Sequence, residues 1–139
     1  MSAKYAWGAR SLSRLSECDG LLRELFFRVI AREDLPFDLT VLCGYRDQKE
    51  QDAAFASGNS KLRWPKSKHN RVPSLAVDVA PFIGGKANHK DWALYNRLAP
   101  IVKDEWGKMR AEGMIPDGED LEWGGDFKSL KDGPHWQLG

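Results

Sequence analysis

The chain has 139 residues, of which 42% are hydrophobic and 29% are charged, and this is the composition of an ordinary globular protein. It excludes a disordered or a membrane protein, and a chain of this length is most simply a single domain over residues 1–139. Its 21 Lys and Arg residues against 20 Asp and Glu residues leave a formal net charge of +1, which argues against a nucleic-acid partner.

The N-terminal segment has no apolar core of signal-peptide length, and no run approaches the roughly 18 apolar residues of a membrane span. We therefore expect synthesis in the cytoplasm and no stable insertion into a membrane. Cys18 and Cys43 do not form a Cys-x-x-Cys motif. The sequence favours buried thiols in a reducing compartment for both.

The first predicted element is an amphipathic helix over residues 19–32. Leucine, phenylalanine and aliphatic residues recur there with a helical period after Asp19, which is a plausible N-cap. A short aliphatic run at residues 39–43 ends at Gly44, and this pattern predicts a buried strand.

A second helix is predicted over residues 47–57. Asp47 and Glu50 have the spacing of a capping box, and Gly58 is a suitable C-terminal stop. Residues 58–73 are polar, basic and interrupted by prolines, which indicates a surface loop. Loops of this length are often functional.

The next predicted strand, residues 75–81, carries a carboxylate. Alternation puts Asp78 on the face opposite Val77 and Val79, between two alanines. A charge on a buried strand costs on the order of several kcal/mol unless something pairs with it. A metal ion is one such partner.

The C-terminal third is predicted to contain one long helix and two short strands. The helical pattern covers residues 91–111, and Pro100 should kink or split it. Residues 123–127 and 134–138 have the pattern of short strands or strand ends. In the last segment, His135 and Gln137 alternate with Trp136 and Leu138.

A catalytic zinc site needs about three protein ligands and one open position, and zinc then lowers the pKa of a coordinated water and polarises a carbonyl. His69, Asp78 and His135 would supply such a set. Asp132 is suitably placed for a general base, because the turn from Asp132 to His135 returns its carboxylate toward the metal. Asp126 is the rival base, and other combinations of His and Asp remain open on this argument.

Several motifs together resemble the LAS-type zinc peptidases, the group that includes lysostaphin, D-Ala-D-Ala peptidases and Sonic hedgehog. The family pattern Ser-x-His, then Ala-x-Asp, then Asp-x-x-His is present as Ser67 to His69, Ala76 to Asp78 and Asp132 to His135. The upstream Gly-Tyr-Arg-x-x-x-x-Gln is present as Gly44 to Gln51. The chain is most similar to the phage endolysins that act as L-alanyl-D-glutamate endopeptidases.

One spacing departs from the broad family. Eight residues separate His69 from Asp78, where six with an internal glycine are usual. The endolysin branch accepts this longer form, so we interpret it as a branch marker.

The resemblance implies an α+β fold in which a small, mainly antiparallel sheet carries the zinc site and helices pack against it. It implies that His69, Asp78 and His135 bind Zn²⁺ and that Asp132 is the acid/base residue. Arg46 would stabilise the oxyanion. The residues expected to support the site or to contact substrate are Ser67, Gln51 and Trp136.

The implied activity is zinc-dependent hydrolysis of an amide bond in the peptidoglycan stem peptide, between L-Ala and D-Glu. The implied protein is a monomeric endolysin of a phage or prophage, which stays in the host cytoplasm until release to the cell wall. Alternatives are a D-Ala-D-Ala carboxypeptidase or dipeptidase, and a non-catalytic zinc-containing binding module. An HNH-type nuclease would have to use His89, which the sequence places in a solvated loop.

Overall fold

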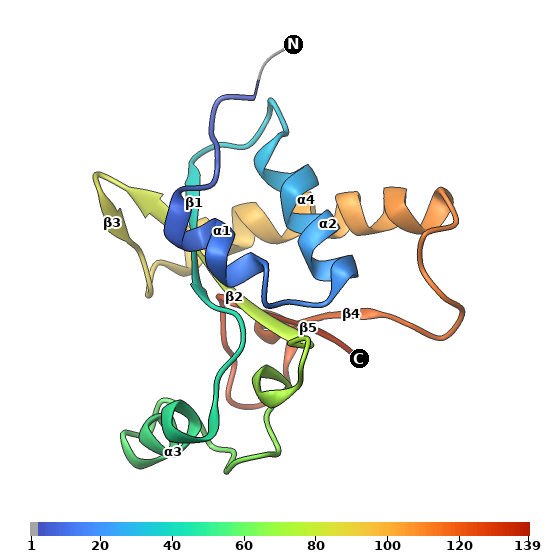
Figure 1. Cartoon of the computed structure of the whole chain (residues 1–139). Helices are drawn as coiled ribbons and strands as arrows, with labels where there is room; N and C mark the ends of the chain where they lie inside the picture. The colour runs from blue at the N-terminus through green and yellow to red at the C-terminus, as the bar shows by residue number, and fades with distance from the viewer. Residues whose placement is uncertain (1–2) are drawn as a thin grey trace.

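A computed structural model describes residues 3–139. Figure 1 shows the elements in chain order, with short 3-10 helices labelled η: α1 (Ala9–Leu15), α2 (Gly20–Ile30), β1 (Asp38–Cys43), α3 (Gln48–Ala56), η1 (Lys68–Asn70), β2 (Ala76–Ile83), β3 (Lys86–Ala87), α4 (Trp92–Ala111), β4 (Leu121–Trp123), η2 (Gly124–Asp126) and β5 (His135–Leu138).

The strands form one small sheet in the order β1-β2-β5-β4, and β3 pairs with the far end of β2. The pairings of β2 with β1, β3 and β5, and of β4 with β5, are all antiparallel. The fold is therefore α+β with a small antiparallel sheet, as the family resemblance implied. The long β2 is central, so β1 and β5 are both its hydrogen-bonded neighbours.

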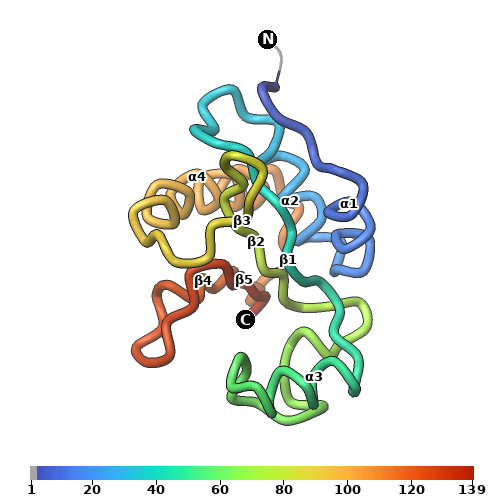
Figure 2. Tube along the Cα trace, turned by 90° about the vertical axis from the view of Figure 1, so that its left-hand side faces the viewer, coloured from blue at the N-terminus to red at the C-terminus, as the bar shows by residue number. Residues whose placement is uncertain are grey.

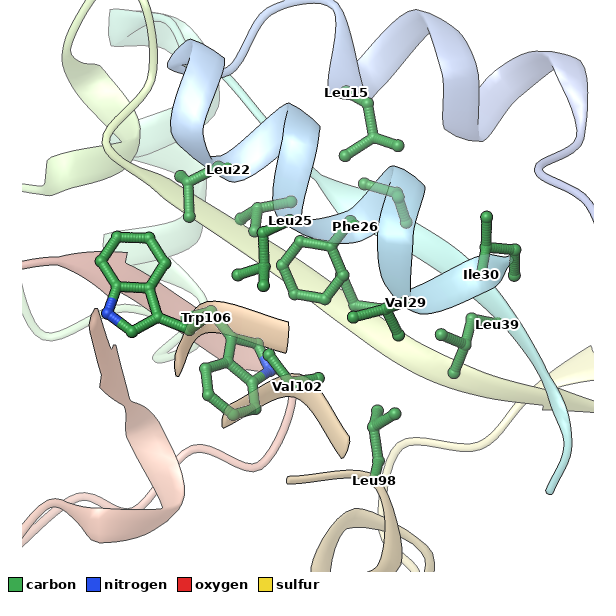
Figure 3. Packing of buried hydrophobic residues seen from close by; sticks show 14 of the residues in the cluster. Leu15, Leu22, Leu25, Phe26, Val29, Ile30, Leu39, Leu98, Val102 and Trp106 are labelled. Atoms are coloured by element: carbon green, nitrogen blue, oxygen red, sulfur yellow. The ribbon is translucent and has the colours of Figure 1, made fainter. Parts of the chain in front are cut away.

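Three helices cover one side of the sheet, whereas α3 lies at the opposite end of the molecule (Figures 1 and 2). The helical stripe of α2 supplies the centre of the core, where Leu25, Phe26 and Val29 are fully buried. Figure 3 shows these side chains directed toward β2 and α4. Val77 of β2 belongs to the same cluster, so this sheet face is hydrophobic and the opposite face is available for a site.

The predicted helix starts are confirmed by their capping contacts. The Asp19 carboxylate accepts a hydrogen bond from the Leu21 amide at 2.9 Å, at the start of α2. At the start of α3, Asp47 and Glu50 form the reciprocal capping box. Each contact satisfies an amide that the first helical turn leaves without a partner.

The prediction that Pro100 kinks or splits the long helix is wrong as regards a split. Helix α4 runs without interruption through Pro100 over 20 residues. Pro100 has no N–H, so it cannot donate the helical hydrogen bond to the Asn96 carbonyl. Pro100 and Asn96 are both exposed, so water can reach this turn of the helix.

Four short elements were not predicted: α1, η1, η2 and the β2–β3 hairpin. Of residues 123–127, where a strand or strand end was expected, only Trp123 belongs to a strand, and η2 follows it. Gly84 and Gly85 both have positive φ angles and form the turn of this hairpin. Helix α1 protects the outer edge of β1. The Ser11 hydroxyl accepts a hydrogen bond from the Val41 amide at 2.9 Å, and the Arg14 guanidinium donates one to the Val41 carbonyl at 2.7 Å. These side chains replace a neighbouring strand.

The end of β1 passes so close to α1 that only glycine fits at residue 44. A Cβ atom on Gly44 would collide with the backbone carbonyl of Arg14. We expect Gly44→Ala to lower the free energy of unfolding by about 1–3 kcal/mol, the usual cost of overpacking, as measured by urea denaturation.

Gly107→Ala is the matched control for this substitution. Gly107 lies inside α4 with no atom near its missing Cβ, so alanine should stabilise the helix by up to about 1 kcal/mol. If Gly44→Ala were as stable as the unmodified protein, the close contact between α1 and β1 would not constrain the fold.

Within residues 3–139, no helix is both long enough and apolar enough to cross a membrane.

Candidate active site

The polar face of the sheet carries one row of chemically active side chains across three neighbouring strands. Asp78 of β2 is the direct pairing partner of Cys43 on β1 and of His135 on β5. Directly paired residues project from the same face of a sheet. Val77 pairs with Trp136 on the other face, which belongs to the core.

His69 reaches this row from η1, which is part of the long loop before β2. The Ser67 hydroxyl caps η1 by accepting a hydrogen bond from the His69 amide at 3.2 Å. The His69 ring is buried, and its Nδ1 donates a hydrogen bond to the Gly44 carbonyl at 2.7 Å. This bond orients the ring so that Nε2 is directed toward Asp78.

His135 is oriented in the same way from the opposite side of Asp78. Its Nε2 donates to the side-chain oxygen of Gln137 at 2.8 Å, and Gln137 in turn donates to Glu122 at 3.0 Å. The Nδ1 atom is therefore the nitrogen that faces the site. Metal-binding histidines commonly donate their outer N–H to an oxygen in this manner.

The two inward nitrogens approach the same carboxylate oxygen. His69 Nε2 lies 3.3 Å and His135 Nδ1 lies 3.1 Å from Oδ1 of Asp78. Ligand atoms at 2.0–2.2 Å from a tetrahedral zinc ion lie roughly 3.3–3.5 Å apart, so both separations are close to those of zinc ligands.

The donors form two overlapping groups in which the potential ligand atoms lie within 4.8 Å of one another. One group is Cys43, His69 and Asp78, and the other is Asp78, Asp132 and His135. The two histidines thus belong to different groups, and Asp78 joins them. Among residues 3–139, the buried Nε2 of His69 makes no hydrogen bond of normal geometry, although it faces the Asp78 carboxylate at 3.3 Å, and such an inward-directed imidazole nitrogen fits a metal ligand.

The charges of the site favour a cation beside Asp78. Burial acts to raise the pKa of Asp78, but the adjacent His69 and His135 outweigh it and hold this pKa far below its usual range. Burial acts to lower the pKa of His69, but the Asp78 carboxylate outweighs it and raises this pKa. Asp78 is therefore a carboxylate that needs positive charge, and a metal ion supplies it in the same place.

Asp132 lies at the solvent-exposed edge of the second group. Its amide donates a hydrogen bond to the Gly124 carbonyl at 3.0 Å, and a Cβ atom on Gly124 would collide with the Asp132 carbonyl. Desolvation and then the charge of Asp78 raise the pKa of Asp132, while His135 acts to lower it. A carboxyl with a raised pKa, close to two potential ligands but held on a separate turn, is suited to proton transfer.

Arg46 and Gln51 belong to a polar network beneath His69. The Arg46 guanidinium lies 3.9 Å from Asp78 and donates to the Gln51 side-chain oxygen at 3.0 Å. That oxygen also accepts a hydrogen bond from Asn70 at 3.1 Å, and Gln51 is 0% exposed. The Arg46 amide donates to the His69 carbonyl at 2.8 Å. Gln51 thus fixes α3 and η1 to each other and positions Arg46.

The tryptophans lie behind the site and not within it. Trp136 is 1% exposed and stacks on Trp123, with ring centroids 5.7 Å apart. It cannot touch a substrate in this position, because it lies on the hydrophobic face of β5. Trp123 donates a hydrogen bond to the Gly133 carbonyl at 2.8 Å and so supports the turn that carries Asp132.

The remaining candidates belong to neither of these donor groups. Asp126, the rival base, forms an ion pair with Lys103 at 2.7 Å, and both side chains are about half exposed. His89 is exposed and belongs to neither group of potential ligands.

Sequence reasoning missed Cys43, Asn70 and Gln137 as contributors to the site. For Asn70, the pattern Ser67-x-x-Asn70 was a signal, since these residues form a reciprocal cap around η1. For Gln137, its shared face with His135 was visible in the alternation of β5. Cys43 gave no such signal, because strand alternation assigned it to the same face as Val41.

The comparisons with known proteins agree with this geometry. The model of the phage L-alanyl-D-glutamate peptidase family matches residues 1–138. The chain is 28% identical over 144 residues to the L-alanyl-D-glutamate peptidase of Escherichia phage T5, with 96% of this chain and 98% of that protein covered.

A solved structure is similar over nearly the whole chain. It is the crystal structure of the L-Ala D-Glu endopeptidase ChiX of Serratia marcescens, with a TM-score of 0.68 and 27% sequence identity, and it covers 98% of this chain and 92% of that one. The resemblance inferred from the motifs is confirmed, and nothing supports the nuclease alternative. With a family model that matches almost every residue, the chain belongs to the phage L-alanyl-D-glutamate peptidase family and is a peptidase.

Proposed function

We propose that this peptidase hydrolyses the amide bond between L-Ala and D-Glu in the peptidoglycan stem peptide, with Zn²⁺ held by His69, Asp78 and His135. The observation that carries the proposal is the approach of two oriented imidazole nitrogens to a single oxygen of Asp78, at 3.3 and 3.1 Å. The choice of bond follows from the family and from the activities named for its two relatives.

Zn²⁺ at this position would lower the pKa of a water molecule toward about 7 and polarise the carbonyl of the substrate. Asp132 accepts a proton from the attacking water as the water oxygen bonds to the carbonyl carbon of L-Ala. Asp132 then donates that proton to the nitrogen of D-Glu as the carbon–nitrogen bond breaks. One amide and one water thus give one carboxyl group and one amine.

Arg46 is the residue that we assign to the carbonyl oxygen while it is negatively charged. Its guanidinium lies 3.9 Å from Asp78, and the buried Gln51 orients it with a hydrogen bond of 3.0 Å. Ser67 and Gln51 act on the reaction by positioning His69 and Arg46. Trp136 is buried and supports β5 from the core.

The biological setting follows from the same proposal. The protein acts as a monomer on the bacterial cell wall. It accumulates in the cytoplasm of the host until it is released, as expected of a phage lysis enzyme.

Digestion of purified sacculi tests the proposal. The zinc-loaded protein should release peptides whose new N-terminus is D-Glu, as identified by mass spectrometry. A chelator should abolish the release, and added Zn²⁺ should restore it. Release that continues at the same rate after complete removal of metal would contradict the proposal.

Two other products would support the alternatives. Release of free D-Ala alone would indicate a D-Ala-D-Ala carboxypeptidase. A protein that binds one equivalent of zinc but releases no peptide would indicate a non-catalytic binding module.

A further inference from the structure

Cys43 lies in the row of active side chains although the sequence favours a purely structural thiol for it. As the pairing partner of Asp78 on β1, it projects from the same sheet face as Asp78 and His135. The reason is a bulge in β1. Val41 pairs with Val79, and Cys43 pairs with Asp78, so Leu42 is an extra residue on the β1 side. The bulge turns Cys43 away from the core face of Val41.

The Cys43 sulfur lies within 4.8 Å of potential ligand atoms of His69 and Asp78. Sulfur and nitrogen ligands of a tetrahedral zinc ion lie roughly 3.6 Å apart, with zinc–sulfur and zinc–nitrogen bonds of about 2.3 and 2.0–2.1 Å. An approach of little more than about 1 Å would therefore bring the sulfur to ligand distance from His69 and Asp78. His135 lies outside this group, so a site that includes all four side chains also needs the two groups to close around Asp78.

The contacts of Cys43 are weak or already involve the site. The thiol donates a long hydrogen bond, 3.6 Å, to the adjacent Gly44 carbonyl, and its side chain also interacts with the ring of His69. That oxygen already accepts hydrogen bonds from His69 at 2.7 Å and from the Ser74 hydroxyl at 3.2 Å. Without the thiol, the Gly44 carbonyl oxygen would still accept these two hydrogen bonds, which is its full capacity.

A second observation points to a ligand on this side of Asp78. The Nε2 atom of His69 is buried and is directed into the group formed by Cys43, His69 and Asp78. Among residues 3–139 it makes no hydrogen bond of normal geometry, although it lies 3.3 Å from the Asp78 carboxylate. His69 as a whole is 3% exposed, so water does not readily reach this atom. A metal ion between His69 and Asp78 would therefore lie next to the Cys43 sulfur.

We propose that Cys43 is a fourth metal ligand in the resting enzyme, where its thiolate competes with water for the position that catalysis needs open. This inference rests on the proposed zinc site at His69, Asp78 and His135. Four protein ligands make a closed site, and three with water make a catalytic one. Dissociation of Cys43 would then accompany activation, and the sulfur would favour thiophilic ions such as Cd²⁺.

Substitution of Co²⁺ for Zn²⁺ provides a readout that does not depend on activity. A cobalt–thiolate bond gives an intense charge-transfer absorption in the near ultraviolet, which imidazole and carboxylate ligands do not give. We expect this band in the unmodified protein at one equivalent of Co²⁺ and its loss in Cys43→Ser. The visible absorption from the remaining ligands should persist in that variant.

Cys18→Ala is the matched control, because it removes the other thiol. Cys18 is 1% exposed, its sulfur approaches the backbone carbonyls of Arg14 and Ala76, and it belongs to neither donor group. The band should therefore persist in Cys18→Ala. Cys43→Ser should also bind Cd²⁺ less tightly, by at least roughly 10- to 100-fold. That is the usual loss of metal affinity when a residue that only hydrogen-bonds to a ligand is removed.

The outcomes separate this inference from the proposed function. Cobalt binding without the band, in a protein that digests sacculi, overturns the role of Cys43 and leaves the proposed function intact. A band that persists in Cys43→Ser has the same meaning. Failure of the unmodified protein to bind any Co²⁺ or Zn²⁺ overturns both. If Cys43→Ser does not fold, cadmium NMR of the unmodified protein decides, since sulfur coordination moves the cadmium resonance strongly downfield.

Discussion

Asp132→Ala should reduce the rate of peptide release from sacculi by about 10²- to 10⁴-fold, which is the usual contribution of a general acid or base. The physical reason is that the two donor groups contain two carboxylates, Asp78 and Asp132, and Asp78 has the position of a ligand. The variant should keep its fold and its zinc, because Asp132 lies at the exposed edge of the donor group and holds its turn through backbone atoms. Peptide release, zinc content and circular dichroism measure these three properties.

Asp126→Ala is the control for this experiment. Asp126 lies in the neighbouring turn and forms an exposed ion pair with Lys103 at 2.7 Å, outside the donor groups. Its removal should cost no more than about 1 kcal/mol of stability, the usual upper value for an exposed pair. If Asp132→Ala retained more than about a tenth of the unmodified rate, another group would have to be the base.

His135→Ala should strongly reduce the zinc that stays bound after dialysis and abolish the release of peptides. His135 supplies one of the two imidazole nitrogens that face Asp78, and its loss leaves only the group of Cys43, His69 and Asp78, which does not include Asp132. The affinity for zinc should fall by more than roughly 10- to 100-fold. That range is the usual loss when a residue that only hydrogen-bonds to a metal ligand is removed. Metal analysis after dialysis, together with a zinc titration, measures the change.

His89→Ala is the matched control, since His89 is exposed and lies outside both donor groups. It should keep one equivalent of zinc and the full rate. Unchanged zinc content in His135→Ala would remove His135 from the ligand set. Zinc content that fell in both variants alike would instead indicate binding to the surface of the protein.

The predicted elements that hold up best are those whose signal is local. The α2 helix has a continuous apolar stripe and an Asp19 cap, and α3 has a capping box between Asp47 and Glu50. Each signal lies within a few residues of the chain, so propensity and patterning suffice. Helix α1 had no such signal. Its seven residues are held by the contacts of Ser11 and Arg14 with β1, which is distant in sequence.

By itself, the sequence determined the family motifs, the antiparallel α+β class and the spacing of His69, Asp78 and His135 along the chain. Motif residues can be recognised one by one because their chemistry restricts which amino acids are possible. The sequence does not show that His69 and His135 meet at one carboxylate oxygen of Asp78. Their meeting depends on the pairing of β2 with β5, and hence on contacts between distant segments.

Only the tertiary structure decided the position of Cys43. Strand alternation has a period of two residues, so one extra residue reverses the face of everything after it. The extra residue is Leu42, and no local pattern marks it, because the bulge exists only in the register between β1 and β2. For Trp136, alternation along β5 already put the side chain on the face opposite His135, and the pairing with Val77 identifies that face as the core.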